Sequence, residues 1–363
     1  MPLYKNPDFR NLSGGLAAIF ASDLRQSFFA LPEWYDLMSR VGLLEPSKAR
    51  VYTDERRGSS AGLLLQASSA EAGGRLTSLA NFYSVEHGLL SAAGADLDRA
   101  VAAILSEIQS DRPRWDRLQL AEFDPLEPGF GALLRGLRHA GFLVEATTGA
   151  ATWFEATAGM SFPDYLAQRP SRLRNTWRRR RRSIDRSSRL TTRFFSDGAG
   201  LETAIADYQA VYANSWKPAE PFPHFIPSLI RMAGQLGALR MGVYYLGGKP
   251  AAAQFWIIWH GRAIIYKLAH DQRFDALSLG TLLTMEMIER VLERDRPCEI
   301  NFGRGDDPYK KLWMTRRRER WGITAANPRT FAGLRFGLER EAAKLYHRIR
   351  GGGASLPPLS AEP

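Results

Sequence analysis

The chain has 363 residues, which is too many for one average domain and enough for two of about 150 each. Its 45% hydrophobic and 24% charged residues exclude a disordered chain, and its apolar runs are too short to span a membrane. A single cysteine, Cys298, excludes an internal disulfide and a cysteine-rich metal site. The N-terminus has no apolar core of the secretory type, so we expect a cytoplasmic protein without a transmembrane segment.

The first half of the chain alternates helical and extended patterns. Apolar residues at helical spacing, among them Ala100 and Ile104, predict a helix over 97–109. Gly141 ends a second predicted helix, as glycine often does. The predicted order is a helix, three strands, a helix, a strand, a helix and two strands, over 22–41, 49–55, 61–69, 75–85, 97–109, 116–123, 129–141, 143–149 and 151–156.

The second half repeats this order behind a longer lead. Glycine turns at 247–248 and 260–261 separate three strands of a meander. Leu279, Leu283 and Met287 share one face of the best helix in the chain. The predicted elements occupy 190–197, 201–216, 225–237, 239–247, 251–260, 263–271, 279–295, 298–303, 309–314 and 319–327, followed by a basic helix over 331–349 and a flexible tail over 351–363.

The net charge of +11 is concentrated in one segment. Residues 169–193 contain eleven arginines and a single acid, and most of them fall on a predicted helix. Three interpretations fit this run: a solvated charged helix, a nucleic-acid contact in which Trp177 stacks on a base, or contact with a polyanionic substrate or a membrane surface. We favour an anionic substrate or carrier, bound by Arg178, Arg181 and Arg182.

The sequence LSLGTLL, residues 277–283, opens the strongest predicted helix. The N–H groups at a helix start, together with the helix dipole, suit a phosphate or a developing negative charge. Gly280 lets a ligand approach closely, and Ser278 is placed either to cap the helix or to bond a phosphate. The alternative is an ordinary capped helix. In this order of elements we favour a phosphate site made by Ser278, Gly280 and Thr281.

The sequence FGRGDDPYKKLW, residues 302–313, follows a strand that we expect to be buried. Gly303 and Gly305 permit a sharp corner at the carboxyl end of this strand, where sites in α/β sheets tend to lie, and Asp306 follows them as a candidate for substrate binding. The alternative is a turn followed by a solvated basic helix. Cys298 begins the strand and is expected in the core, and His270, at another strand end, is expected to be structural.

Together, these motifs resemble the GNAT fold. The resemblance is strongest to the CelD/BcsL-type acetyltransferases, relatives of the Fem aminoacyl transferases of peptidoglycan cross-bridge synthesis. It covers about residues 165–327, through the arginine-rich helix, the strand meander, the LSLGTLL helix start and the FGRGDDPYKKLW corner. It implies an α/β fold of tandem GNAT-like domains, each a mixed, mostly antiparallel sheet flanked by helices. The expected divisions are a degenerate GNAT-like domain, a linking arginine helix, the acyltransferase domain, and a basic helix with its tail, over 1–160, 161–189, 190–328 and 329–363.

The resemblance also implies roles for residues at the corner. Tyr309 would protonate the departing thiolate, and Lys310 would stabilise charge on the reacting carbonyl. Both roles make chemical sense, because acyl transfer forms an oxyanion and expels an anion. Asp271, Asp306 and Asp307 are near strand ends that should face the site, and Asp271 is the candidate general base, although a surface carboxylate is the commoner role for each.

The expected function is transfer of an acyl group from acyl-CoA, the co-substrate, to an amine or hydroxyl in a ternary complex. No tightly bound cofactor and no metal are implied. The expected acceptor is an anionic small molecule or a glycan- or lipid-linked precursor of the envelope or of an exopolysaccharide, with peripheral membrane contact as a further option. Two alternatives remain: a Fem-like transferase that uses aminoacyl-tRNA, and a non-catalytic scaffold that binds anions.

Overall fold

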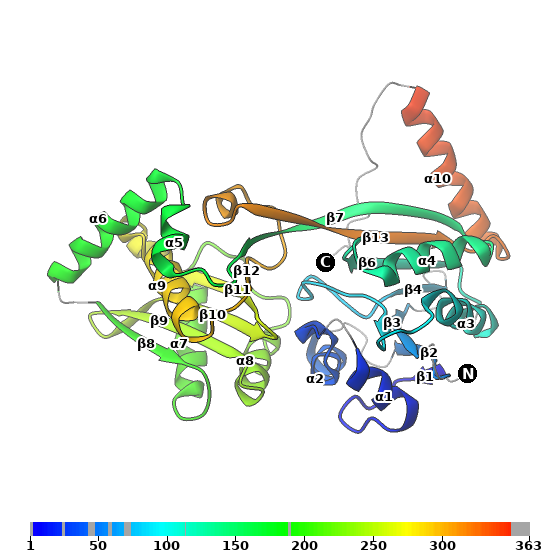
Figure 1. Cartoon of the computed structure of the whole chain (residues 1–363), viewed down its shortest axis with the longest axis horizontal. Helices are drawn as coiled ribbons and strands as arrows, with labels where there is room; N and C mark the ends of the chain where they lie inside the picture. The colour runs from blue at the N-terminus through cyan, green and yellow to red at the C-terminus, as the bar shows by residue number, and fades with distance from the viewer. Residues whose placement is uncertain are drawn as a thin grey trace. The chain divides into compact units, whose positions relative to one another are not determined.

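The computed structural model of the chain is shown in Figure 1. It describes residues 3–23, 26–42, 48–56, 60–68, 74–112, 114–187 and 190–349, so the expected flexible tail over 351–363 lies outside the described residues. The chain divides into two compact units, which we call unit 1 (Met1–Ala151 with Glu319–Pro363) and unit 2 (Thr152–Arg318). The arginine helix belongs to unit 2, so these units do not follow the divisions expected from the sequence.

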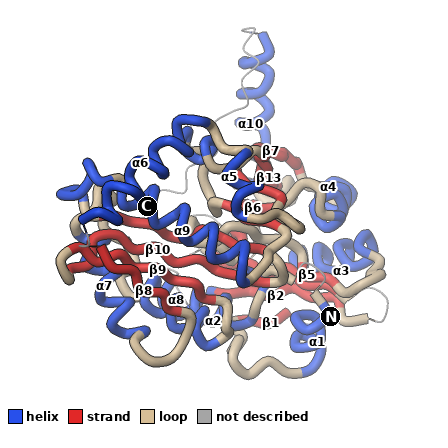
Figure 2. The backbone as a smooth tube through the Cα atoms, turned by 60° about the vertical axis from the view of Figure 1, so that its left-hand side comes forward, coloured by secondary structure: helices blue, strands red, loops and turns tan. Residues whose placement is uncertain are grey.

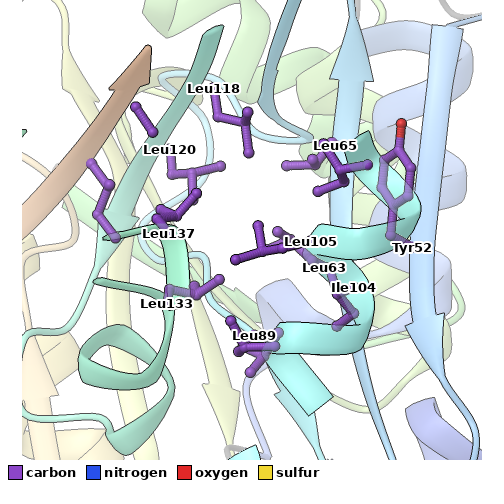
Figure 3. Close-up of a cluster of buried hydrophobic side chains, with 14 of the residues drawn as sticks. Tyr52, Leu63, Leu65, Leu89, Ile104, Leu105, Leu118, Leu120, Leu133 and Leu137 are labelled. Atoms are coloured by element: carbon purple, nitrogen blue, oxygen red, sulfur yellow. The ribbon is translucent and has the colours of Figure 1, made fainter. Parts of the chain in front are cut away.

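Unit 1 packs helices against both faces of a sheet. Along one central strand, Leu63 and Leu65 point to a core with two helices, whereas Gly62 points to the opposite face, where an added Cβ would lie 3.4 Å from Ile19. Figure 3 shows this core, in which Leu63, Leu65, Ile104 and other apolar side chains converge. The elements are β1 (Leu3–Lys5), α1 (Gly14–Ser22), α2 (Pro32–Leu37), β2 (Ala49–Asp54), β3 (Ala61–Ala67), β4 (Arg75–Ser78), β5 (Leu90–Ser91), α3 (Leu97–Ser110), β6 (Arg117–Phe123), α4 (Pro128–His139) and α10 (Phe331–Ile349).

Unit 2 also has helices on both faces of its strands. Helices α7 and α8 cover one face, and α5, α6 and α9 cover the other (Figure 2). The elements are α5 (Phe162–Ala167), α6 (Ser171–Ser187), β8 (Leu190–Phe195), α7 (Leu201–Ala213), α8 (Phe225–Gln235), β9 (Leu239–Leu246), β10 (Lys249–Trp259), β11 (Arg262–His270), η5 (Gln272–Leu277), α9 (Leu279–Arg294), β12 (Glu299–Asn301) and η6 (Pro308–Leu312). Strands β7 (Leu143–Ala156) and β13 (Arg316–Ala326) each run through both units.

The two units share one plan. The strand order is β1-β2-β3-β4-β6-β13 in unit 1 and β8-β9-β10-β11-β12-β7 in unit 2. In each, one pair of strands is parallel, β4 with β6 and β11 with β12, and the other pairs in the order are antiparallel. The last strand in the order of unit 1, β13, comes from the second half of the sequence. The last strand in the order of unit 2, β7, comes from the first half. The expected α/β class, with mixed, mostly antiparallel strands flanked by helices, is therefore confirmed.

Several predicted elements are wrong in detail. The single helix expected over 22–41 is broken, because Pro32 starts a new helix and cannot continue an older one. The two strands expected over 143–149 and 151–156 are one strand, β7. Cys298 is exposed rather than in the core, because it lies just before β12 at the Gly261 turn, where its Sγ donates to the Gly261 carbonyl at 3.1 Å. No helix within the described ranges is long and apolar enough to cross a membrane.

Candidate functional site

Strands β11 and β12 of unit 2 are paired over only part of their length. They pair in parallel only from Arg262↔Glu299 to Ile264↔Asn301, and β11 then continues to His270. The chain after β12 turns away into the glycine corner. The second half of β11 therefore has no hydrogen-bonded partner from β12, and two predicted motifs, the helix start and the corner, follow the ends of these two strands.

The predicted phosphate loop lies in an open pocket of about 350 Å³. Ser278, Gly280 and Thr281 line it together with Trp216 and His270. Ser278 has a left-handed backbone (φ 56°, ψ 40°), and its side chain does not cap the helix, so the capping role is wrong. The buried Gln254 donates to the Gly280 carbonyl at 3.1 Å and to Thr284 Oγ1 at 2.6 Å, which fixes the start of α9 on β10.

His270 closes one side of this pocket. Its ring lies 4.6 Å from that of Trp216, and its Nε2 is 2.9 Å from Asp275 Oδ1. A Cβ added to Gly280 would lie 3.0 Å from His270 Nδ1, which is tighter than almost all real contacts of this kind. A side chain at 280 would therefore need the His270 ring, which contacts Trp216 and Asp275, to shift by a few tenths of an ångström.

Lys310 is buried, not solvated. Its side chain is only 5% exposed, and its Nζ donates to the carbonyls of Arg304 at 2.9 Å and Gly305 at 3.1 Å. Its Nζ also lies 3.0 Å from Asp307 Oδ2. Burial lowers the pKa of Lys310, and the hydrogen bond to Asp307 opposes that shift. The interpretation of the corner as a turn before a solvated helix thus fails at Lys310, whose ammonium group is enclosed by the corner itself.

Tyr309, in the same corner, is partly exposed to solvent. It is 43% exposed and packs edge-on against the buried Phe302, with ring centroids 5.8 Å apart. Burial of the phenol, and secondarily the negative charge of Asp307, raise the pKa of Tyr309 to about 12. The phenol therefore keeps its proton at neutral pH and can donate it.

The predicted acids are held by arginines or by Lys310. Asp271 is buried and accepts from Arg273 Nε at 3.0 Å, and this hydrogen bonding lowers the pKa of Asp271. Asp306 accepts from Trp153 Nε1 at 2.6 Å and from Arg317 at 2.8 Å. A carboxylate whose pKa is lowered takes up a proton less readily, which weakens the case for Asp271 as a base.

A family model, the GNAT acetyltransferase domain, matches residues 171–311, which span the helix start and the corner. This part of the chain is therefore similar to GNAT acetyltransferase domains. No curated protein matches the chain. Among solved structures, the chain is similar to FemX, with a TM-score of 0.59 at 11% identity over 89% of this chain and 97% of that one.

Two further solved structures share the fold of this chain. The C-terminal domain of a putative lysylphosphatidylglycerol synthetase from Agrobacterium fabrum has a TM-score of 0.52 at 12% identity, covering 88% of this chain and 92% of that one. L-PGS from Bacillus licheniformis has a TM-score of 0.51 at 9% identity, covering 91% and 96%. At these identities the likeness shows the fold, and it extends over both units.

The arginine helix α6 is anchored on the core of unit 2. Trp177 packs edge-on against Phe162, with ring centroids 5.6 Å apart, so it anchors the helix on the core. Arg181 lies 3.4 Å from Glu286 of α9, while Arg178 and Arg182 are exposed. None of these three arginines lines the pocket at the start of α9. An anion held by α6 would therefore be held outside that pocket.

Sequence reasoning missed a group of residues beside the pocket. Lys217 Nζ lies 5.7 Å from the ring centroid of Trp216 and 5.9 Å from that of Tyr212. Lys267 on β11 forms a 2.6 Å ion pair with Glu220. Lys267 could have been singled out from the sequence as a candidate site residue, because it is a lone charge within the apolar run AIIYKLAH. Lys217 and Glu220 follow α7 in a proline-rich loop, where charged residues are common and do not indicate a site.

Burial, and then the nearby charge of Lys267, lower the pKa of Lys217 to about 8. Weaker contributions come from Glu220, Lys310 and Asp307. Lys217 adjoins Trp216 of the pocket, and the charges of Lys310 and Asp307 at the corner affect its pKa.

Proposed function

We propose that the GNAT domain transfers an acyl group from acyl-CoA to an amine or hydroxyl acceptor by direct attack within a ternary complex. The observation that carries this proposal is the open pocket at the start of α9, with Ser278, Gly280 and Thr281 on its wall. The pyrophosphate of CoA would bind the free N–H groups of the first helical turn.

Within this proposal, Tyr309 protonates the departing thiolate. Its exposure and its retained proton suit that task. Lys310 fixes the corner through two backbone carbonyls and supplies a buried positive charge that favours the developing oxyanion. Asp271 remains the proposed base, now acting with Arg273 bound to it.

For the acceptor we propose an anionic precursor of the cell envelope, contacted by Arg178, Arg181 and Arg182 and by the corner residues Gly303, Gly305 and Asp306. The composition of α6 supports the first part, because this helix carries eight arginines and a single acid, Asp185. The named activity of the lysylphosphatidylglycerol synthetase neighbour fits an envelope acceptor.

The Fem-like alternative, an aminoacyl-tRNA donor, is favoured by the similarity to FemX over most of both chains and by α6. The two donors differ in how many phosphates the protein neutralises. CoA offers a compact pyrophosphate, whereas tRNA would engage many phosphates along α6. Each neutralised phosphate steepens the dependence of binding on salt concentration.

We expect an acyl-CoA alone to serve as donor, with release of free thiol in the presence of a panel of amine and hydroxyl acceptors. Raising salt from about 50 to 200 mM should weaken donor binding only modestly, because few phosphates are contacted. A protein with six or more phosphate contacts would lose about a thousandfold over this range. Inert acyl-CoA, with charged tRNA active and binding that collapses in salt, would replace this proposal by the Fem-like one.

We expect Gly280→Leu to reduce acyl-CoA affinity by about tenfold or more, because a side chain at 280 collides with His270 and occupies the helix start. Isothermal titration calorimetry measures the effect. Gly131→Ala in α4 is the matched control, because its Cβ would meet only the end of the Arg135 side chain, at 3.2 Å. Unchanged affinity in Gly280→Leu would place the donor elsewhere.

A further inference from the structure

One side of helix α10 packs on strand β7 within unit 1 (Figure 1). Arg340 Nη2 lies 2.7 Å from Glu145 Oε2, and both side chains are mostly buried. Gly337 is buried, and a Cβ added to it would lie 2.4 Å from Leu143 Cδ1, so the helix backbone lies close against the strand. These contacts fix which side of α10 faces unit 1.

Another side of α10 is apolar and exposed. Phe331 is 84% exposed, Leu334 40% and Leu338 58%, and Ala342 further along the helix is exposed as well. Their spacing of three or four residues places them along one side of the helix, and we call this set the apolar stripe. A single exposed apolar residue needs no explanation, but a stripe along one side of a helix is typical of a docking surface.

The sequence around the apolar stripe is basic. Residues 329–350 contain six arginines and lysines and two acids, Glu339 and Glu341, which gives a net charge of +4. Arg335 is exposed and lies 3.5 Å from Glu339. An apolar stripe on a basic helix complements a surface that is both apolar and negatively charged, as an anionic bilayer is. A second copy of α10 would bring like charges together, and a nucleic acid would leave the stripe in water.

We propose that the apolar stripe docks unit 1 on the surface of an anionic membrane. Phe331, Leu334 and Leu338 enter the boundary between the lipid headgroups and the acyl chains, while Arg335 stays at the level of the phosphates. Because Arg340 ties α10 to β7, docking of the helix holds unit 1 at the membrane. The inference does not rest on the proposed acyl donor.

The test measures co-sedimentation of the full-length protein with vesicles of phosphatidylcholine, alone or with about 30% phosphatidylglycerol. We expect the protein to bind the anionic vesicles at least about tenfold more tightly than the neutral ones. Raising salt from about 0.1 to 0.5 M should weaken this binding, because salt screens the attraction between the helix and the headgroups. Equal or absent binding to the two kinds of vesicle overturns the proposal.

The double variant Leu334→Gln with Leu338→Gln removes the centre of the apolar stripe without changing the charge. It should bind anionic vesicles at least about tenfold more weakly, because less apolar area enters the membrane. Leu126→Gln is the matched control, because Leu126 is an exposed leucine of unit 1 outside α10, and it should bind normally. Thermal unfolding should be the same in all three proteins, since the replaced side chains are exposed. Unchanged binding in the double variant contradicts the proposal.

The arginine helix α6 is basic too, so a probe on α10 must show which surface touches the lipid. Leu338→Cys with Cys298→Ser provides one thiol for the environment-sensitive dye NBD. Its emission should shift to the blue with anionic vesicles, and replacing Arg178, Arg181 and Arg182 by glutamine should leave the shift in place at saturating vesicle concentration. An unshifted spectrum on bound vesicles would assign the contact to another surface and overturn the proposal.

A second copy of the chain is the competing occupant of the apolar stripe. Analytical ultracentrifugation would then show a dimer that Leu334→Gln with Leu338→Gln dissociates, while the native protein leaves vesicles unbound, and this result overturns the proposal. Failure of the proposed function looks different, because inert acyl-CoA would leave vesicle binding and the NBD shift unchanged.

Discussion

Replacing Lys310 by alanine is expected to slow acyl transfer by about ten- to a thousandfold, equivalent to about 1.4 to 4 kcal/mol of barrier. The lysine is buried and bridges the carbonyls of Arg304 and Gly305, so its loss removes both a fixed cation and the brace of the corner. Tyr309→Phe should fall in the same range, because only the phenol proton is lost. Release of thiol from acyl-CoA measures both variants.

Lys311→Ala is the matched control, because Lys311 is the next residue and is exposed. It should retain normal turnover. Thermal unfolding separates a chemical effect from loss of the corner: Tyr309→Phe should unfold at the temperature of the native protein, and Lys310→Met should show how much of the Lys310 effect is structural. Near-normal turnover in both Tyr309→Phe and Lys310→Ala would contradict the assignment of the corner as the catalytic centre.

Replacing Arg169 by alanine is expected to destabilise the protein by about 3 to 5 kcal/mol. Arg169 and Glu155 are almost fully buried and form a 2.6 Å ion pair. Arg169 also donates to the Trp313 carbonyl at the end of η6, and Glu155 accepts from Thr315 Oγ1 at 2.7 Å. Removing Arg169 would leave the buried Glu155 carboxylate without its positively charged partner.

Urea denaturation followed by tryptophan fluorescence measures this loss. The double variant Arg169→Met with Glu155→Gln should lose less stability than the two single variants added together, because neither charge is then left alone. Arg231→Ala is a control, because the Arg231–Glu202 pair lies on the surface and should barely move the midpoint. Additive losses in the double variant would show that the two residues act independently.

Local patterns determined much of this fold from the sequence. The helix over 279–295 was predicted because its apolar residues recur on one face, and α9 occupies Leu279–Arg294. The meander was predicted because glycine turns divide three apolar runs, which became β9, β10 and β11. The residues expected at the donor pocket, Ser278, Gly280 and Thr281, also lie together, since they are neighbours in one loop.

Tertiary structure decided whatever depends on residues far apart in sequence. Strand β7 pairs with β12, and β13 with β6, so each sheet is completed by the other half of the sequence, and no local pattern specifies those partners. Lys310 sits in a sequence that favours a solvated basic turn, yet the corner folds around its ammonium group. Lys217 carries no sequence signal, because its low pKa comes from burial and from lysines 50 and 93 positions away. Periodicity reports which face of an element is apolar, but the electrostatic environment of a side chain depends on contacts that only the folded chain creates.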